Sequence, residues 1–395
     1  MVMSNSYTSR MEDAIWQDSF TPEECEDFRE VIEYLNSKDF RSFGDGLTAL
    51  VYKKYPGKAD IPALDVLKDY CIARGVDIAE IGSVNTLKGW FYKQAERPKK
   101  GDGDRQKMFA MAFALNFSVE ETRELFNKVF LDRAFNFRNP KECVYYHCLK
   151  NGLSYQDAKA MIAQIAIVSD DATDATQYTA VVSASVDAAD SAALVRYLNS
   201  HPHNFSINNI SAKQQRERLI GQALEDVKAE CQYERFRGCS LYRKVNGSVS
   251  QELKDISVNE MFEHITGQSM DKSSGTTSIF KNTVLPKEIK TSFPEAAMFS
   301  KKEPTADELR KMIILLYSYY FWCRMQYKGF QIGICTDDIG FDDYVEEMDN
   351  LLFSLGFGKL YPGNPHDWMY CYCTTAEYPL DTFRELLGEV LEYSE

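Results

Sequence analysis

The sequence has no apolar run long enough to cross a membrane. The longest, Met312 to Cys323, is rich in Tyr and falls short of the roughly 20 residues that a membrane helix needs. We interpret this run as a buried helix. The first residues, Met1 to Trp16, lack the apolar core of a signal peptide. We therefore expect a cytoplasmic protein that makes no contact with membranes.

Patterns that carry known chemistry are also missing. None of the ten cysteines belongs to a C-x-x-C pair. Cys371 and Cys373 are one residue apart, and Cys143 and Cys148 flank His147 at a spacing that does not bind zinc. The chain has no Gly-rich phosphate loop, no zincin motif and no serine elbow. We expect reduced, buried thiols in a protein that is not an enzyme and holds no cofactor or metal.

Basic residues are outnumbered by acidic ones and are unevenly placed. The formal net charge is −14, and residues 336–395 hold fourteen acidic residues against only Lys359 and Arg384. Residues 81–110 are different, because they include seven Lys or Arg and only three acidic residues. This balance excludes non-specific coating of nucleic acid by the whole surface, but it permits one basic face on an acidic protein.

Length and patterning predict an all-α protein of several domains. A chain of 395 residues is long for a single core. We expect N-terminal helices over 1–60 and a helical domain over 61–167. Residues 168–184, which include a small, polar and acidic run, are the expected linker. A second helical domain with an acidic end is then expected over 185–395.

Helix boundaries are marked by capping residues. Thr21, Ser118 and Thr305 are each followed three residues later by Glu, which is the pattern of a capping box. Gly75 is suited to a helix end, because glycine favours the left-handed conformation found there. Asp104 is predicted to cap the helix that carries Met108 and Phe109.

The stretch from Ser83 to Trp90, SVNTLKGW, carries the clearest functional signal. It has a small polar start, an apolar residue in the middle and a Trp at the end. A basic turn ending in Arg97-Pro98 follows, and then a helix with Ala114-Leu115. Over about residues 67–130 the chain resembles the lambda-repressor/Cro-like helix-turn-helix family. The first helix of the motif is shortened, since Gly75 to Ser83 leaves room for about one and a half turns.

The resemblance implies a DNA-binding regulatory protein of a bacterium, with double-stranded DNA as its partner. In a helix-turn-helix, residues near the start of the second helix reach base edges, and flanking basic residues hold phosphates. The base readers would be Asn85 and Thr86, and Trp90 would lie in the core. The other nucleic-acid-binding residues implied are Lys88, Lys93, Arg97, Lys99, Lys100 and Arg105. The C-terminal half would form a homodimer or bind a protein partner.

Two other functions stay open. The protein could be a helical interaction scaffold in which the motif is degenerate and its Lys residues only aid solubility. It could also be a ribonuclease, because Arg196 and His201 fit the loose pattern of the all-helical HEPN family. In that family two such motifs meet across a dimer to cleave RNA, and His201 would be catalytic. A His near a helix C-terminus is also favoured there by the helix dipole.

Two further segments have both a functional and a structural interpretation. Tyr233 to Lys244, YERFRGCSLYRK, alternates aromatic and basic residues as in proteins that bind single strands. We favour a helix end whose rings lie in the core. A group of carboxylates between Asp337 and Asp349 could hold a divalent metal, but acidic residues are also favoured at a helix start. We interpret this group as a solvated helix start.

Overall fold

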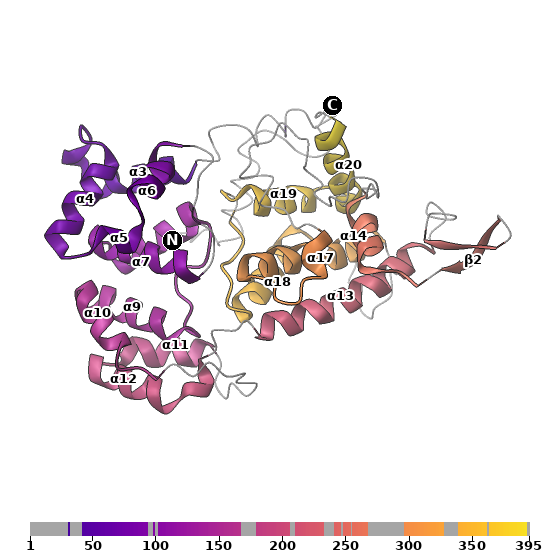
Figure 1. Cartoon of the computed structure of the whole chain (residues 1–395). Coiled ribbons are helices and arrows are strands. Elements are labelled where there is room, and N and C mark those ends of the chain that lie inside the picture. Colours follow the sequence, from indigo (N-terminus) through magenta and orange to yellow (C-terminus); the bar gives the residue numbers. More distant parts are fainter. Residues whose placement is uncertain are drawn as a thin grey trace, which may run out of the picture. The chain divides into compact units, whose positions relative to one another are not determined.

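The structure is a computed structural model of the chain. It describes Val31 and, with gaps between them, residues 42–93, 98, 102–166, 179–205, 210–232, 241–245, 248–253, 255–267, 296–327, 339–361 and 363–392. The described part is all-α apart from one short hairpin (Figure 1). The prediction of an all-α protein is therefore confirmed.

The chain divides into two compact units. The first unit comprises residues 41–211 with 351–359, and the second comprises 1–40, 212–350 and 360–395. The predicted domain boundaries differ from this division. Residues 42–60 share a core with the helices after residue 61, and the helices after residue 179 also belong to the first unit. The chain leaves the first unit near residue 211, not within 168–184, of which 168–178 lie outside the described residues.

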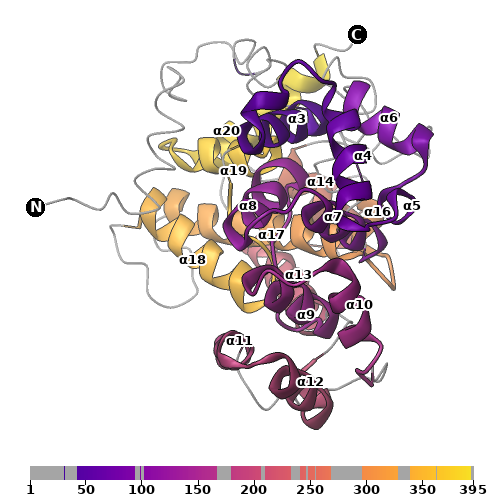
Figure 2. The ribbon, with the colours of Figure 1, turned by 90° about the vertical axis from the view of Figure 1, so that its left-hand side faces the viewer.

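The described elements of the first unit are helices. They are α3 Phe43–Lys54, η1 Pro56–Lys58, α4 Ala63–Arg74, α5 Ile78–Ile81, α6 Val84–Tyr92, α7 Asp102–Ala114, α8 Val119–Glu124, η2 Leu125–Phe130, α9 Pro140–Lys150, α10 Tyr155–Ile162, α11 Thr179–Ala188, α12 Ser191–Ser200 and η3 Pro202–Asn204. Helices α3 to α7 lie together, and α11 and α12 lie at the other end of the unit, beyond α9 and α10 (Figures 1 and 2).

The second unit combines helices with the hairpin. Its elements are α13 Ile210–Glu230, β1 Tyr242–Val245, β2 Ser248–Leu253, α14 Val258–Thr266, α16 Ala296–Phe299, α17 Ala306–Gln326, α18 Phe341–Ser354, α19 Pro365–Thr374 and α20 Pro379–Glu392. The two strands pair antiparallel, with Tyr242 opposite Leu253 and Val245 opposite Ser248. The segment Tyr233 to Lys244 therefore ends in a strand and not in a helix, and residues 233–240 lie outside the described residues.

In the first unit, α3 and α6 approach each other closely. A Cβ atom added to Gly44 would lie only 2.4 Å from the carbonyl oxygen of Trp90, so glycine is required for this approach. The ring of Phe43 meets that of Trp90 edge-on, with 5.7 Å between their centroids. This packing fixes the buried face of α6 against the core.

In the second unit, the core is built on two helices. The apolar run Met312 to Cys323 lies within α17 and is buried except at Tyr317 and Tyr320, as the sequence predicts. Every residue of α19 is buried. Trp322 of α17 stacks on Tyr370 of α19, with 5.8 Å between ring centroids.

The capping boxes at Ser118 and Thr305 are confirmed, and Thr21 lies outside the described residues. The cap at Asp104 is wrong, since α7 already begins at Asp102.

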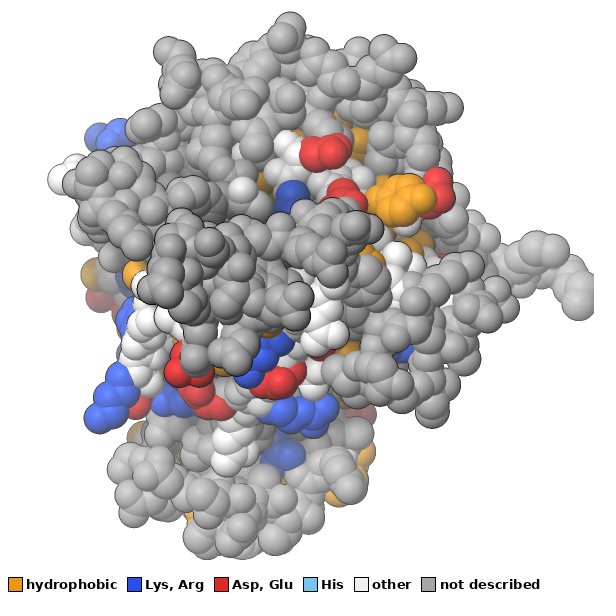
Figure 3. Space-filling view, turned by 90° about the vertical axis from the view of Figure 1, so that its right-hand side faces the viewer, with side chains coloured by type: hydrophobic (Ala, Val, Ile, Leu, Met, Phe, Trp, Pro, Cys, Tyr) orange, Lys and Arg blue, Asp and Glu red, His pale blue; other side chains and the backbone are white. Residues whose placement is uncertain are grey.

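Of the described helices, none has the length and apolar character to span a membrane. Figure 3 views the side where β2 lies in Figure 1 and shows Lys and Arg beside Asp and Glu, not gathered in one field.

Candidate nucleic-acid interface

Helix α6 begins where the sequence predicts. The Ser83 hydroxyl accepts a hydrogen bond from the backbone N–H of Thr86 at 3.2 Å, which satisfies a donor that the first turn leaves open. The preceding helix, α5, has four residues and is capped by Asp77. The segment between Gly75 and Ser83 thus holds one helical turn, as its length predicts.

One face of α6 lies in the core. Leu87, Trp90 and Phe91 are buried, and Gly89 beside them is buried as well. The prediction that Trp90 is a core residue is confirmed. These contacts set the rotation of the helix about its axis, so they also decide which side chains face outward.

The opposite face of α6 presents four side chains to solvent. Val84, Asn85, Lys88 and Tyr92 are exposed, Val84 by 56% and Tyr92 by 59%. At 100° of rotation per residue these four positions fall within one arc of about 100°. We call them the α6 strip. No acidic residue lies between Val84 and Tyr92, so the α6 strip is uniformly neutral or positive in a protein of net charge −14.

The predicted contact residues lie in different places. Asn85 and Lys88 belong to the α6 strip, and Lys93 is exposed directly after the helix. Thr86 does not join them, because it is half-buried and its hydroxyl lies 2.9 Å from that of Ser83. Val84, which the sequence analysis did not single out, occupies the exposed position instead. Arg97, Lys99 and Lys100 lie outside the described residues.

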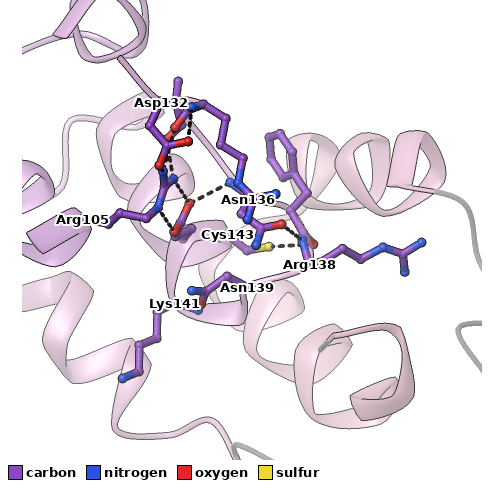
Figure 4. A network of polar contacts seen from close by, with 11 residues as sticks. Arg105, Asp132, Asn136, Arg138, Asn139, Lys141 and Cys143 are labelled. Carbon is purple, nitrogen blue, oxygen red and sulfur yellow. Dashed lines mark hydrogen bonds and ion pairs between the residues drawn. The ribbon is translucent and has the colours of Figure 1, made fainter. Parts of the chain in front are cut away.

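Arg105 is not part of any surface. Its side chain is buried, and its Nε and Nη2 atoms donate to the two carboxylate oxygens of Glu142 at 2.8 and 2.7 Å. Its Nη1 atom donates to Asp132 at 2.6 Å (Figure 4). The prediction that Arg105 contacts nucleic acid is wrong, because its guanidinium is enclosed and bonded to two carboxylates.

The Arg105 network holds the loop after η2 in place. Burial alone would lower the pKa of Arg105, but the Glu142 and Asp132 carboxylates beside it raise that pKa above its ordinary value. Arg105 also donates to the Arg133 carbonyl at 3.0 Å, and Glu142 accepts from the Asn136 backbone N–H at 2.7 Å. The loop backbone is thus held by Arg105 itself at Arg133 and through Glu142 at Asn136.

The residues of the ribonuclease hypothesis lie at the end of α12. Arg196 and His201 are both exposed. The His201 ring packs on Tyr197, with 4.8 Å between centroids, and its Nδ1 atom lies 3.1 Å from the Tyr197 carbonyl. This contact with its own helix matches the helix-end role that the sequence also allowed.

The acidic group at the start of α18 has structural roles. Asp343 accepts a hydrogen bond from the backbone N–H of Gly340, and buried Asp349 accepts from that of Leu360. Asp337 and Asp338 lie outside the described residues. Among the residues that the structure describes, no three or more His, Cys, Asp or Glu side chains are placed to hold a metal ion.

The second unit contains a buried charge network that the sequence analysis missed. Glu230 is fully buried, and its carboxylate accepts hydrogen bonds from both Nη atoms of Arg384, at 2.9 and 3.0 Å. His264, Tyr319 and Tyr327 also lie within hydrogen-bond distance of its carboxylate. Although burial alone would raise the pKa of Glu230, the His264 and Arg384 bonds lower it to about 2.

Asp226 lies one turn before Glu230 and is also fully buried. One of its carboxylate oxygens accepts from the Gln222 amide at 2.9 Å, and the other has no hydrogen-bond partner. Burial, reinforced by the nearby Glu225 and Glu230 charges, raises the pKa of Asp226 from 3.8 to about 6.

Comparisons with models of protein families, with curated proteins and with solved structures found no match to this chain. The case for a function therefore rests on the geometry of the chain itself.

Proposed function

We propose that this protein binds double-stranded DNA through α6 and acts as a regulatory protein. The observation that supports the proposal is the α6 strip, which presents Asn85 and Lys88 on one outward face with no carboxylate on the helix. An α-helix fits the major groove, where amide and ammonium groups pair with base edges and phosphates.

The charge around α6 supports the same proposal. The Lys88 side chain has no ion-pair partner within the described residues, and exposed Lys93 follows one residue after the helix end. Further along the sequence, Arg97, Lys99 and Lys100 outnumber the single acidic residue of that stretch, Glu96. The nearest acidic residue before the helix, Glu80, is paired with Lys159 at 2.9 Å. An anionic backbone would therefore meet positive charge on this segment.

The test is fluorescence anisotropy of the full chain with random-sequence duplex DNA and with single-stranded RNA, each at two salt concentrations. We expect duplex binding that weakens steeply with salt, because phosphate contacts release counterions. Lys88→Glu should weaken it roughly tenfold or more, since it removes a phosphate contact and sets a carboxylate against the DNA backbone. A Lys88→Glu/Lys99→Glu/Lys100→Glu variant should not bind.

Lys58→Glu is the matched control. Lys58 is exposed, belongs to the same unit and lies in η1, outside α6 and its flanking residues. It should bind like the wild type. If wild type, the Lys88 variant and the triple variant are equally inert toward duplex DNA, the proposal fails and the helical interaction scaffold takes its place.

A further inference from the structure

Val84 is unusual for the first residue of a surface helix. It is 56% exposed and lies on the one face of α6 that does not pack on the protein. The Ser83 hydroxyl next to it is engaged by the Thr86 N–H and by the Thr86 hydroxyl. The start of α6 therefore presents an apolar side chain outward, while the Ser83 and Thr86 hydroxyls bond to each other at the cap.

Asn85 directly follows and is exposed. Within the described part of the chain its side-chain amide has no hydrogen-bond partner, so its donor and its acceptor are both available. In the major groove this pair of groups matches adenine, which presents an acceptor at N7 and a donor at N6. The same base pair presents the C5-methyl group of thymine, which binds apolar side chains.

We infer that α6 selects A·T base pairs, with Asn85 bonded to adenine and Val84 packed on the methyl group of thymine. The inference rests on the proposed DNA-binding function and adds the identity of the bases that are read. Val84 and Asn85 are adjacent in the sequence but lie about 100° apart around the helix, at the two edges of the α6 strip. They would therefore meet different bases across the width of the groove.

Lys88 and Tyr92 extend the same strip along the helix. Nine residues of helix are about 13.5 Å long, which spans roughly four base pairs. Lys88 lies one turn beyond Val84 and would reach a phosphate or a neighbouring base. The preference for A·T therefore concerns the end of the contact that Val84 and Asn85 occupy.

Chemical substitution in the DNA tests the inference directly. The probes are three duplexes two helical turns long: alternating A·T, the same duplex with uracil in place of thymine, and alternating G·C. Uracil lacks only the methyl group. We expect wild type to bind the A·T duplex roughly fourfold more tightly than the A·U duplex, as burial of one methyl group implies. Both should be bound more tightly than G·C.

Two variants assign the preference to residues. Val84→Ser, which puts a polar group in place of the apolar side chain, should bind A·T and A·U duplexes equally. Asn85→Ala should lose the preference for A·U over G·C, and it should become insensitive to replacement of adenine by 7-deazaadenine, which lacks the N7 acceptor. Both residues are exposed, so both variants should keep the circular dichroism spectrum of the wild type.

Ile72→Ala is the matched control. Ile72 is the most exposed large apolar side chain described, at 83%, but it belongs to α4. This variant should keep the wild-type ratio between A·T and A·U. Salt-dependent duplex binding with equal affinity for A·T and A·U, or with preference for G·C, overturns the inference and leaves the proposed function intact. Absence of any duplex binding overturns both.

Discussion

Asp226 shows how a single buried carboxyl sets a pH dependence. Its pKa of about 6 in the folded protein lies above its ordinary value of 3.8. Between pH 3.8 and about pH 6, the folded state therefore still holds a proton that the unfolded state has already released. The stability that this proton contributes is complete below pH 3.8 and is lost as the pH rises to about 6.

Asp226→Asn is therefore expected to stabilise the protein at neutral pH. Asn keeps the hydrogen-bonding shape without the charge. The difference between 3.8 and about 6 corresponds to roughly 3 kcal/mol, so the gain should approach that figure at pH 7 and shrink toward pH 4. Urea unfolding at both pH values measures it. Exposed Asp255→Asn serves as the control and should change little, and an equal effect of Asp226→Asn at both pH values would contradict the prediction.

Arg105 is the corresponding case for a buried cation. Arg105→Ala would leave the buried Glu142 carboxylate and its neighbour Asp132 without their partner. We expect a loss of about 3–5 kcal/mol in the free energy of unfolding. Lys53→Ala, which breaks the exposed pair with Glu124, should cost at most about 1 kcal/mol. Comparable small losses in both variants, measured by urea unfolding, would show that the Arg105 network does not stabilise the loop.

At the scale of elements, the position of α6 depends on its contact with α3. Because a Cβ atom at Gly44 would meet backbone, neither helix can yield by changing a rotamer. Gly44→Ala must therefore displace α6 and separate Phe43 from Trp90. We expect a loss of about 1–3 kcal/mol in stability and weaker duplex binding, as for other overpacked sites.

Gly57→Ala is the control for Gly44→Ala, since a Cβ atom at Gly57 would have no neighbour within 4 Å. Thermal unfolding and anisotropy of both variants make the comparison. If Gly44→Ala is as stable as the control and binds duplex DNA equally well, the close contact between α3 and α6 does not decide which side chains of α6 face outward.

The sequence predicted those elements whose signals are local. Ser83 as a cap, the spacing of Leu87 and Trp90, and the shortness of α5 between Gly75 and Ser83 all follow from neighbouring residues. The hairpin was missed, although Asn246-Gly247 between its strands is the strongest short signal for one.

Other features could not be predicted because they depend on distant residues. The partners Asp132 and Glu142 follow Arg105 by 27 and 37 positions, so composition could not separate this buried Arg from an exposed one. Arg384 is 154 positions from Glu230. The boundary near residue 211 likewise reflects which helices pack together, and an acidic run such as 169–176 carries no information about that.

At the scale of the whole molecule, the proposed function sets two effects against each other: the net charge of −14 would oppose DNA over long distances, and the α6 strip would attract it at contact. These two effects have different ranges. The screening length is about 30 Å at 0.01 M salt and about 8 Å at 0.15 M. Repulsion by the acidic C-terminal part should therefore matter only when salt is low.

Neutralising exposed carboxylates on α18 distinguishes the long-range repulsion from the attraction at contact. Asp342 and Glu346 are exposed and are not among the residues of the α6 strip. The Asp342→Asn/Glu346→Gln variant should bind duplex DNA about twofold more tightly than wild type at low salt, because long-range repulsion falls. At 0.15 M salt the two proteins should bind alike, since the Debye length is then about 8 Å. A gain that persists at the higher salt would mean that these carboxylates lie beside the DNA, and the nucleic-acid contact would then extend beyond α6.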